Sequence, residues 1–579
     1  MSNEEQKEKK QIKKKSFFFE DYIEPESLID SKKLDLVKVS LSRVNFLFFI
    51  FFCFVIVFTV KIIYLSLSPL PNKIISSENT NKNFIKKRGD ILDRNGIILA
   101  RNIDIYSAGV RPYLAKDKKK LLINLRLIFP ELETYKIKLK LKKNKFFYIK
   151  KKLTENEKTN LFLLGDKSIL LEKHQFRIYP QKNLLSHILG QIDDDNTGIS
   201  GVEKFFDKDL KTKLLINSSL ELTLDSNLQH IVREELIGAQ SDFNAIGSAA
   251  LLMDVNNGEI LSFVSLPDYD LNKRFSINDD IYTNKITKGV YEMGSVFKTF
   301  TLAAGLENGI IDQKTMFTNL KHKIFCAGRE ISEHDNLPKN LSAEQILIQS
   351  SNIGAVRIAQ KIGIEKYKDF LNSLNLFKTT NFDLEEIGTP IPFRWGKCKL
   401  ATASFGHGIT TTPLQLARAY AILGNGGYEI QPTILKTRSN EYEQKKQIVS
   451  TETSKIVNSI LRKIVSNKEG TANFANIDGY EVGGKTGTAL KSIEGVYTEK
   501  KFNTFVSLFP ISKPKYVLLV ILDEPKPAPY FVYEFSNGYK HKGEKRNTSG
   551  WNTVVVAGKI IEKIGPILAI NNLQASNKF

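Results

Sequence analysis

An apolar run near the N-terminus constrains this chain more than any other feature. Val44–Val60 contains no charged residue, and the apolar character continues past Lys61 to about Leu67. A helix of roughly 20 apolar residues spans the hydrocarbon core of a bilayer, and a lysine near its end can extend its amine toward the interface. The run is longer than the core of a cleaved signal, and no A-x-A pattern follows it. The sequence therefore predicts a retained transmembrane anchor over residues 44–67.

The charges around this anchor bear on its orientation. Basic residues lie close to the run on both sides, so the positive charge near its two ends is almost even. A cluster of six lysines between Lys7 and Lys15 adds charge before the anchor, which favours a cytoplasmic tail over residues 1–43. The polar, charge-mixed composition of this tail is typical of disorder. The body of the chain, beyond a polar linker over residues 68–83, is then expected outside the membrane.

Composition narrows the functions that the body can have. A chain of 579 residues needs two or three domains, and 42% hydrophobic residues suffice for packed cores. The net charge of +21 suits a nucleic-acid binder, or an outward-facing protein beside anionic lipid or cell-wall polymer. Because the lysine runs lack arginine and interleaved aromatic residues, we do not expect nucleic-acid binding. No cofactor motif or metal-ligand pair occurs, so neither a cofactor nor a metal is expected.

The three cysteines build neither a disulfide framework nor a four-cysteine zinc site. Cys53 lies in the apolar run, where it serves as a small hydrophobic residue. Cys326 and Cys398 can pair if their domain is exported, but nothing in the sequence favours that pairing. Their redox state therefore stays open at this point.

Two regions of different composition follow the linker, and together they predict an α+β protein. Residues 84–221 are lysine-rich and mixed α/β, without a catalytic pattern. Residues 222–579 begin with a helix and an apolar hairpin and end with strands and a helix, which suggests one antiparallel sheet whose first and last segments pair, with helices packed on it. The expected elements are a helix at Ser226–Gly238, a hairpin at Gly247–Leu266 turned at Asn256–Gly258, a helix at Ser295–Asn308, strands at Tyr480–Leu490, Phe502–Phe509 and Tyr516–Asp523, and a helix at Trp551–Ile564.

The first chemical motif is an S-x-x-K pattern at Ser295 and Lys298. Both residues lie where a helix should begin, so the hydroxyl and the amine share one face within hydrogen-bond reach. A serine becomes a nucleophile when a base takes its proton, and a lysine is such a base when burial and nearby positive charge lower its pKa. The same pattern occurs at Ser512–Lys515, but a proline interrupts it and no helix follows, so we expect a surface loop there.

The second motif is Ser350-Ser351-Asn352, which follows an amphipathic stretch. A hydroxyl and a carboxamide two residues apart on a turn can face one cleft, where the hydroxyl relays a proton and the amide grips a peptide group. The Ser-x-Asn pattern is common in this chain, so taken alone it equally describes a turn or a helix cap.

The third motif is Gly483-Gly-Lys-Thr-Gly-Thr-Ala489, in a strand context. Small residues allow a ligand backbone to lie beside the strand as an added strand. Lys485 offers a cation for a substrate carboxylate, and Thr486 and Thr488 offer hydroxyl groups. Gly479–Thr486 also fits the spacing of a phosphate-binding loop, but that motif lies between a strand and a helix, whereas this segment reads as a strand, so we do not expect such a loop.

The order and spacing of these three motifs resemble those of the penicillin-binding proteins and serine β-lactamases. Further segments resemble class B penicillin-binding proteins in particular, and the resemblance covers about residue 85 to the end. These segments are Arg88–Gly96, Arg177–Pro180, His187–Gly190, Gly198–Glu203 and Phe405–Gln415. One departure is Met293, where the family often has proline before Gly-Ser.

This resemblance implies a complete architecture and mechanism. It implies a single transmembrane helix, a pedestal domain over 84–221 and a transpeptidase domain over 222–579. Ser295 would attack a D-alanyl-D-alanine stem peptide, with Lys298 as base and Ser350 as proton relay. The remaining implied roles are Asn352 on the substrate amide, Lys485, Thr486, Gly487 and Thr488 at the substrate carboxylate, and the backbone N–H groups of Ser295 and Thr488 as oxyanion hole.

The resemblance also implies partners and a location. The substrate would be peptidoglycan or its lipid-linked pentapeptide precursor, and β-lactams would be inhibitors. A membrane-embedded glycosyltransferase and other divisome proteins would be partners, with membrane lipid around the anchor and no nucleic acid. The protein would lie in the bacterial cytoplasmic (inner) membrane as a single-pass protein, with its catalytic domain on the periplasmic side.

Several alternatives stand beside this interpretation. Ser350-Ser-Asn, Lys485-Thr-Gly-Thr and Thr412–Ala417 look more like the septal than the elongation transpeptidase. A β-lactamase or carboxypeptidase would rarely need an anchor and a pedestal. A β-lactam sensor would need a larger cytoplasmic domain than a 43-residue tail. A non-catalytic divisome scaffold is disfavoured because Ser295 and its partner motifs are intact.

Overall fold

The computed structural model describes residues 36–67, 88–212, 218–273, 280–436, 446–493, 495–534, 538, 540–543 and 545–576. The chain divides into two compact units, residues 1–83 and 84–579. The first unit contains the helix α1 (Leu36–Leu67), which begins eight residues before the predicted anchor. Val44–Ile63 of α1 is long and apolar enough to cross a membrane, and all its side chains are exposed. The predicted linker and most of the predicted tail lie outside the described residues.

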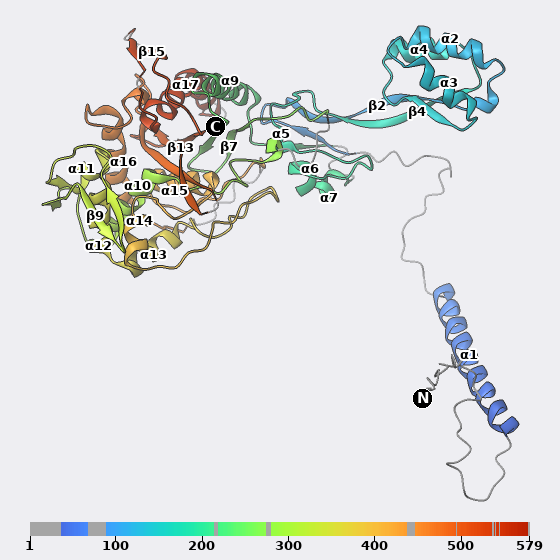
Figure 1. The fold of residues 1–579 in the computed structure, drawn as a ribbon, viewed down its shortest axis with the longest axis horizontal. Coiled ribbons are helices and arrows are strands. Elements are labelled where there is room, and N and C mark those ends of the chain that lie inside the picture. The colour runs from blue at the N-terminus through green and yellow to red at the C-terminus, as the bar shows by residue number, and fades with distance from the viewer. Residues whose placement is uncertain are drawn as a thin grey trace, which may run out of the picture. The chain divides into compact units, whose positions relative to one another are not determined.

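The second unit begins with a long-stranded pedestal sheet (Figure 1). Its path runs β3 (Phe147–Lys150), β2 (Ile98–Val110), β1 (Asp90–Leu92) and β5 (Ser219–Glu221), and β4 (Ile169–Ile178) pairs with β2. The β2–β4 pair is antiparallel from Arg101 opposite Ile178 to Val110 opposite Ile169. The β1–β5 pair is parallel, so it joins chain segments more than a hundred residues apart.

Three helices cover the far end of β2 and β4. They are α2 (Lys118–Ile128), α3 (Thr134–Lys142) and α4 (Glu155–Leu163). Asp117 caps α2 and Thr154 caps α4 in a capping box, which satisfies N–H groups that have no partner inside a helix. Leu121, Leu125 and Phe129 contribute to a small core here that is separate from the main one.

A buried ion cluster holds the base of the pedestal together. Glu203 receives Arg88 Nε on one carboxylate oxygen at 2.6 Å and Arg177 Nε on the other at 2.7 Å. Arg88 also pairs with Asp207 at 2.7 Å, and Arg177 donates to the carbonyl oxygen of Gly89. Three of the segments that carry the class B resemblance therefore meet at one carboxylate.

The core of the second unit is an antiparallel sheet in the order β12-β13-β14-β6-β7. Its strands are β6 (Gly247–Asp254), β7 (Ile260–Leu266), β12 (Gly483–Ile493), β13 (Val496–Phe509) and β14 (Tyr516–Asp523). Every residue of β6, β7 and β14 is buried, which explains why these strands are almost continuously apolar. The β14–β6 pairing confirms the prediction that the first and last segments of the domain join.

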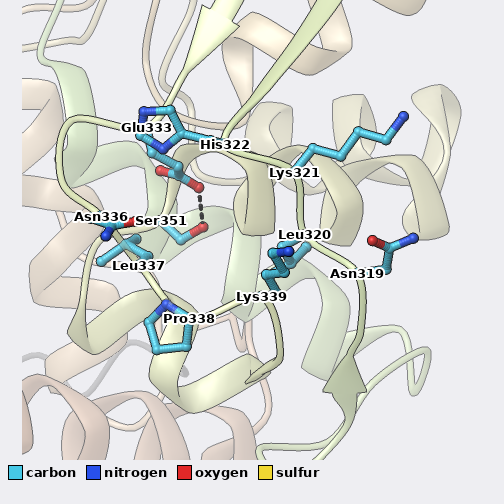
Figure 2. A pocket seen from close by; sticks show the side chains of 10 residues that line it. All are labelled: Asn319, Leu320, Lys321, His322, Glu333, Asn336, Leu337, Pro338, Lys339 and Ser351. Carbon is cyan, nitrogen blue, oxygen red and sulfur yellow. Dashed lines mark hydrogen bonds between the residues drawn. The ribbon is translucent and has the colours of Figure 1, made fainter.

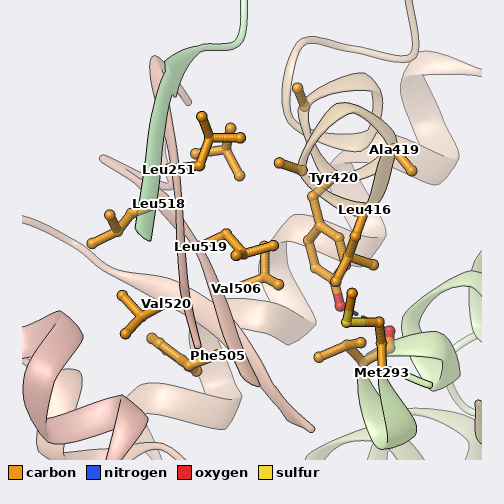
Figure 3. Packing of buried hydrophobic residues seen from close by; sticks show 14 of the residues in the cluster. Leu251, Met293, Leu416, Ala419, Tyr420, Phe505, Val506, Leu518, Leu519 and Val520 are labelled. Atoms are coloured by element: carbon orange, nitrogen blue, oxygen red, sulfur yellow. Dashed lines mark hydrogen bonds between the residues drawn. The ribbon is translucent and has the colours of Figure 1, made fainter. Parts of the chain in front are cut away.

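Helices cover both faces of this sheet. α9 (Ser226–Asp242) and α17 (Thr553–Ser576) pack side by side, on β7 and β14. From the other face α15 (Pro413–Gly424), which is buried along its whole length, packs on β13 and β14 (Figure 3). A helical region beside α15 contains α10 (Phe297–Glu307), α11 (Ala343–Ile348), α12 (Asn352–Ile362), α13 (Ile364–Ser373), α14 (Lys397–Ala403) and α16 (Thr451–Ser466).

The shorter elements connect these layers. They are η3 (Pro112–Leu114), α5 (Ser186–Leu189), α6 (Gly201–Phe205), α7 (Asp207–Leu210), η4 (Asp280–Tyr282), η5 (Gly294–Val296), β8 (Met316–Phe317), β9 (Lys323–Cys326), β10 (Arg329–Ser332), β11 (Leu341–Ser342), η6 (Asn473–Ala475), β15 (Val532–Glu534), β16 (Lys540–Lys542) and η7 (Ser549–Trp551). β9 pairs with β10, β8 with β11 and β15 with β16, each as a small hairpin or ribbon.

Most predicted elements occur, with shifted ends. The strand predicted from Tyr480 begins at Gly483. The strand predicted from Phe502 begins at Val496, because β12 and β13 extend into a long hairpin beyond the buried part of the sheet. The C-terminal helix does not stop at Ile564 but continues through Pro566 to Ser576. Ser512–Lys515 forms the turn between β13 and β14, as the sequence predicts.

Candidate active site

Ser295 lies in a tight turn where three backbone segments meet. The turn is one 3₁₀ turn, η5, and leads directly into α10. Gly294 has φ +61°, and a Cβ there would lie 2.6 Å from the carbonyl oxygen of Thr488. A Cβ on Gly487 would lie 2.3 Å from the Met293 carbonyl oxygen, and one on Gly406 would lie 2.1 Å from that of Gly294. Only glycine permits this close approach, which fixes Ser295 against β12.

The core packs directly behind this turn. Met293 is fully buried, and Thr504 of β13 donates its hydroxyl to the methionine sulfur at 3.8 Å. Tyr420 of α15 donates to the carbonyl oxygen of Val296 at 2.8 Å, so α15 holds the turn from the opposite side (Figure 3). The substitution of methionine for the family's usual proline is therefore accommodated by packing.

Lys298 follows Ser295 by one turn and is buried. Its Nζ donates to the carbonyl oxygen of Ser350 at 2.5 Å and to Ser350 Oγ at 3.2 Å. Burial lowers the pKa of Lys298 from 10.5 to about 7, and the charge of Glu333 opposes that lowering. A lysine with a pKa near neutrality can exchange a proton with a neighbouring hydroxyl under physiological conditions.

Ser350 occupies a strained turn between α11 and α12. Its φ of +59° is unusual for a residue other than glycine, and it directs both of its oxygen atoms toward buried lysines. Ser351, the next residue, caps α12 by accepting the backbone N–H of Gly354 at 2.8 Å. The turn that carries Ser350 is thus fixed by the start of a helix.

Asn352 is placed differently from its neighbour Ser350. Its amide Nδ2 donates to the carbonyl oxygen of Ser332 at 2.8 Å, and the residue is buried. It does not line the large cavity in front of Ser295. In the described structure Asn352 therefore joins α12 to the end of β10.

The predicted strand motif divides its residues between the two faces of β12. Successive side chains of a strand point to opposite faces, which separates Lys485 and Gly487 from Thr486 and Thr488. Thr486 and Thr488 line the cavity, whereas Lys485 is completely buried and does not. Lys485 Nζ donates to Ser350 Oγ at 2.9 Å and to the carbonyl oxygen of Thr486 at 3.1 Å.

Two lysine amines therefore meet at one serine hydroxyl. Burial lowers the pKa of Lys485 well below 10.5, and the nearby Lys298 lowers it further. Two ammonium groups around a single buried oxygen are unfavourable because neither is solvated. The arrangement favours a state in which the pair shares fewer than two positive charges, so one amine is available as a base.

A cavity of about 1030 Å³ opens in front of Ser295. Ser295, Ser350, Thr486 and Thr488 lie in its lining, so the cavity brings together four of the predicted site residues. Three basic residues that lie outside the three motifs also line it: Lys501, Lys545 and Arg546. Their signal in the sequence was lost because lysine is abundant throughout the chain.

Other residues that contact the site also lie outside the three motifs. Thr471 shares a hydrogen bond of 2.9 Å with Thr486, and Ser549 donates its backbone N–H to Thr488 Oγ1 at 3.1 Å. Glu333 lines the same cavity and contacts the turn after Ser350. Within the described ranges, no group of three or more histidine, cysteine or acidic residues is placed to hold a metal ion.

A disulfide answers the question that the cysteine pattern left open. Cys326 at the end of β9 and Cys398 in the first turn of α14 are bonded, with Cα atoms 5.6 Å apart. The bond ties the β9–β10 hairpin, which leads to Glu333, to the helix before Gly406. Both connected segments adjoin the site.

Comparisons with known proteins find relatives for both parts of residues 84–579. Residues 248–543 match the penicillin-binding protein transpeptidase domain, and residues 86–229 match the penicillin-binding protein dimerisation domain. The chain is 31% identical, over 83% of its length and 82% of the relative, to a probable peptidoglycan D,D-transpeptidase FtsI of Caulobacter vibrioides. It is also 31% identical to stage V sporulation protein D of Bacillus subtilis, with 78% of this chain and 76% of that protein covered.

A solved structure shares the fold. Penicillin-binding protein 3 of Mycobacterium tuberculosis, determined in complex with aztreonam, superposes with a TM-score of 0.63 at 21% identity, covering 84% of this chain and 96% of that one. The two matched domains and the shared fold define a serine acyltransferase of the penicillin-binding type. With a dimerisation domain before its transpeptidase domain, this chain belongs to the class B penicillin-binding proteins and is a serine-type peptidoglycan transpeptidase.

Proposed function

We propose that this chain is the D,D-transpeptidase that cross-links stem peptides of the septal cell wall, and that β-lactams acylate its Ser295. The observation that carries the proposal is the meeting of Lys298 and Lys485 at Ser350, in the wall of the cavity that contains Ser295. This site contains a serine hydroxyl for the nucleophile, a lysine with a lowered pKa for the base, and a second hydroxyl that joins this lysine to Lys485.

In the acylation step Ser295 Oγ bonds to the carbonyl carbon of the penultimate D-alanine. Neutral Lys298 takes the hydroxyl proton, which its pKa of about 7 permits near neutral pH. The C–N bond to the terminal D-alanine then breaks, and its nitrogen receives a proton through Ser350, which is hydrogen-bonded to both lysines. The products are an acyl-serine and free D-alanine.

The substrate needs partners for its carboxylate and for the developing oxyanion. Thr486 and Thr488 line the cavity and offer hydroxyl groups to the carboxylate, and buried Lys485 contributes positive potential. The backbone N–H groups of Ser295 and Thr488 serve as the oxyanion hole, where loss of one donor typically costs about 10²–10³ in rate. Asn352 binds the substrate amide when it exchanges its hydrogen bond to Ser332 for one to the substrate. Gly487 keeps β12 close to the turn that carries Ser295.

In the second step an amine of a neighbouring stem peptide attacks the acyl-serine. The new amide forms, Ser295 recovers its proton and the peptides are cross-linked. A cavity of about 1030 Å³ has room for an acceptor peptide beside the acyl group.

Septal rather than elongation duty is supported by sequence features. The Ser-Ser-Asn and Lys-Thr-Gly-Thr motifs have the septal form, and a relative bears the name FtsI. Stage V sporulation protein D and a probable D,D-transpeptidase named PenA are similar to the chain as well, at 31% and 29% identity. On this proposal the partners are a membrane-embedded glycosyltransferase and other divisome proteins.

The proposed location follows from α1. Its exposed apolar span lies in the cytoplasmic membrane among lipid, and residues 84–579 lie on the periplasmic side. The disulfide supports this side, because disulfides persist in the periplasm and are rare in the cytosol.

Labelling with a fluorescent penicillin tests the nucleophile. The wild-type chain should be labelled and Ser295→Ala should not, whereas Ser512→Ala, a matched change in the exposed copy of the pattern, should label normally. Equal labelling of Ser295→Ala would refute the proposal.

Adding a donor amine to a D-alanyl-D-alanine substrate separates transfer from hydrolysis, since a transpeptidase yields amide product. Septal duty is tested by the position of a fluorescent fusion in dividing cells.

A further inference from the structure

Glu333 is a buried carboxylate that the established motifs do not include. It follows β10 and accepts three hydrogen bonds from the start of α12: the Ser351 hydroxyl at 2.6 Å, the backbone N–H of Asn352 at 2.7 Å and that of Ile353 at 2.9 Å. The first N–H groups of a helix have no partner within it and carry partial positive charge, so a carboxylate is strongly favoured there. Glu333 is thereby fixed in one position.

The residue before Glu333 holds the same turn from another direction. The carbonyl oxygen of Ser332 accepts the amide of Asn352 at 2.8 Å. Ser350 immediately precedes these anchored residues and is held at φ +59°. Since the oxygen atoms of Ser350 receive both catalytic-site lysines, any shift of Glu333 would shift the hydroxyl on which the lysines converge.

Glu333 also acts on Lys298 through its charge. It lies in the wall between the large cavity and a second cavity of about 310 Å³, whose lining it shares with Ser351 (Figure 2). The charged groups that act on Lys298 or respond to it are Lys485 from β12, and Glu333 and His334 from the segment after β10. Among these, Glu333 is the group that stabilises the lysine's charged form against burial.

We propose that Glu333 is a positioning residue for acylation, which fixes Ser350 through α12 and supplies a carboxylate charge that acts on Lys298. The inference rests on the proposed roles of Ser295 and Lys298. A purely structural cap would affect only the first property. A charged residue that tunes the base affects both, and the two effects are measured separately.

The test is the pH dependence of penicillin acylation of the full-length, detergent-solubilised chain. Glu333→Gln should slow acylation about tenfold or more, because the base becomes weaker and α12 loses a charged cap. In a plot of acylation rate against pH, the part that rises at low pH is the acidic limb. For this variant the acidic limb should move to lower pH, because Lys298 loses the charge that favours its protonation. Ser351→Ala removes the hydroxyl's bonds to Glu333 and to the Gly354 N–H but keeps the carboxylate, so it should lower the rate and leave the limb in place.

Glu330→Gln is the matched control. Glu330 lies three residues earlier on β10, is exposed and pairs only weakly with Lys323 at 3.4 Å, so its change should alter neither rate nor limb. An unchanged limb in Glu333→Gln overturns the proposal, whatever happens to the rate. If that variant does not fold, Glu333→Asp decides: its shorter side chain draws the charge back from its place against α12, so slower acylation with a shifted limb supports the proposal and an unmoved limb overturns it. Absence of Ser295-dependent labelling in the wild-type chain would instead refute the proposed function.

Discussion

At the scale of single residues, the protonation of Lys298 controls the proposed chemistry. Its pKa of about 7 lies below that of an ordinary lysine, so the amine is protonated and inactive as a base below pH 7 and neutral above it. We expect the rate constant of penicillin acylation to rise about tenfold per unit of pH below this value and to level off above it. Single-turnover acylation across pH checks this. A profile that rises only near pH 10 would contradict a buried neutral base.

Lys485 offers a second residue-scale prediction. Its amine occupies a fully buried position between Ser350 Oγ and the Thr486 carbonyl oxygen, where the larger guanidinium of arginine cannot reproduce the same contacts. Lys485→Arg should therefore acylate about a hundredfold more slowly, in the range seen when one stabilising donor is lost. Lys513→Arg, in the exposed turn between β13 and β14, is the control for the same chemical change. Rapid-quench labelling measures both, and near-wild-type acylation by Lys485→Arg would contradict the geometry.

The sequence predicted the residues whose spacing is itself a chemical signal. Ser295 and Lys298 are one helical turn apart, and Thr486 and Thr488 alternate along a strand, so their common faces follow from local geometry. Glu333 gave no such signal, because its partner Ser351 lies 18 positions further along the chain. The inward direction of Lys485 was also not foreseen, since a strand pattern does not tell which of its faces meets the cavity.

At the scale of elements, the disulfide makes the β9–β10 hairpin part of the site. The bond spans 72 residues, and constraining a loop of that length stabilises the folded state by about 4 kcal/mol in the chain-entropy account. We expect Cys398→Ser to lower the melting temperature and to slow penicillin acylation, because the hairpin that leads to Glu333 loses its covalent tether. Reductant should have the same effect on the wild-type chain.

Thermal unfolding and labelling in parallel check this prediction. Cys53→Ser is the control, since Cys53 is an exposed, unpaired cysteine in α1. Unchanged acylation in Cys398→Ser together with a lowered melting temperature would show that the tether serves stability alone. The pairing was left open by the sequence because two cysteines far apart in the chain approach each other only through tertiary structure.

Local sequence patterns also did not predict all ends of the helices and strands. α17 continues past Pro566 although proline usually interrupts a helix, and its last turns lie beyond the buried residues that mark it in the sequence. The buried strands β6 and β14 were predicted to the residue at Gly247 and Tyr516–Asp523, because a run of apolar residues bounded by turns has sharp ends.

At the scale of the whole molecule, the buried cluster around Glu203 determines whether the pedestal base holds together. Removing one member of a buried ion cluster leaves uncompensated charge and typically costs about 3–5 kcal/mol. We expect Glu203→Gln to lower the free energy of unfolding by about this amount, because Arg88 and Arg177 lose their shared partner. Glu133→Gln, which breaks an exposed pair with Lys136, should change it by less than about 1 kcal/mol. Denaturant titration compares the two, and equal stabilities would contradict the role given to the cluster.

The division of the chain into two units leads to the last prediction. All of the proposed chemistry, from Ser295 to Ser549, lies within residues 84–579, and so do both hydrophobic cores. In the first unit, the described side chains of Val44–Ile63 are all exposed, so this apolar span gains stability only from a lipid or detergent environment. A protein comprising residues 84–579 should therefore fold, remain soluble without detergent and be acylated by penicillin at the rate of the full chain. Sedimentation without detergent and single-turnover labelling check the two properties, with Ser295→Ala in the same background as the blank. Loss of acylation in a folded, soluble 84–579 protein would mean that the first unit contributes to the site and not only to anchoring.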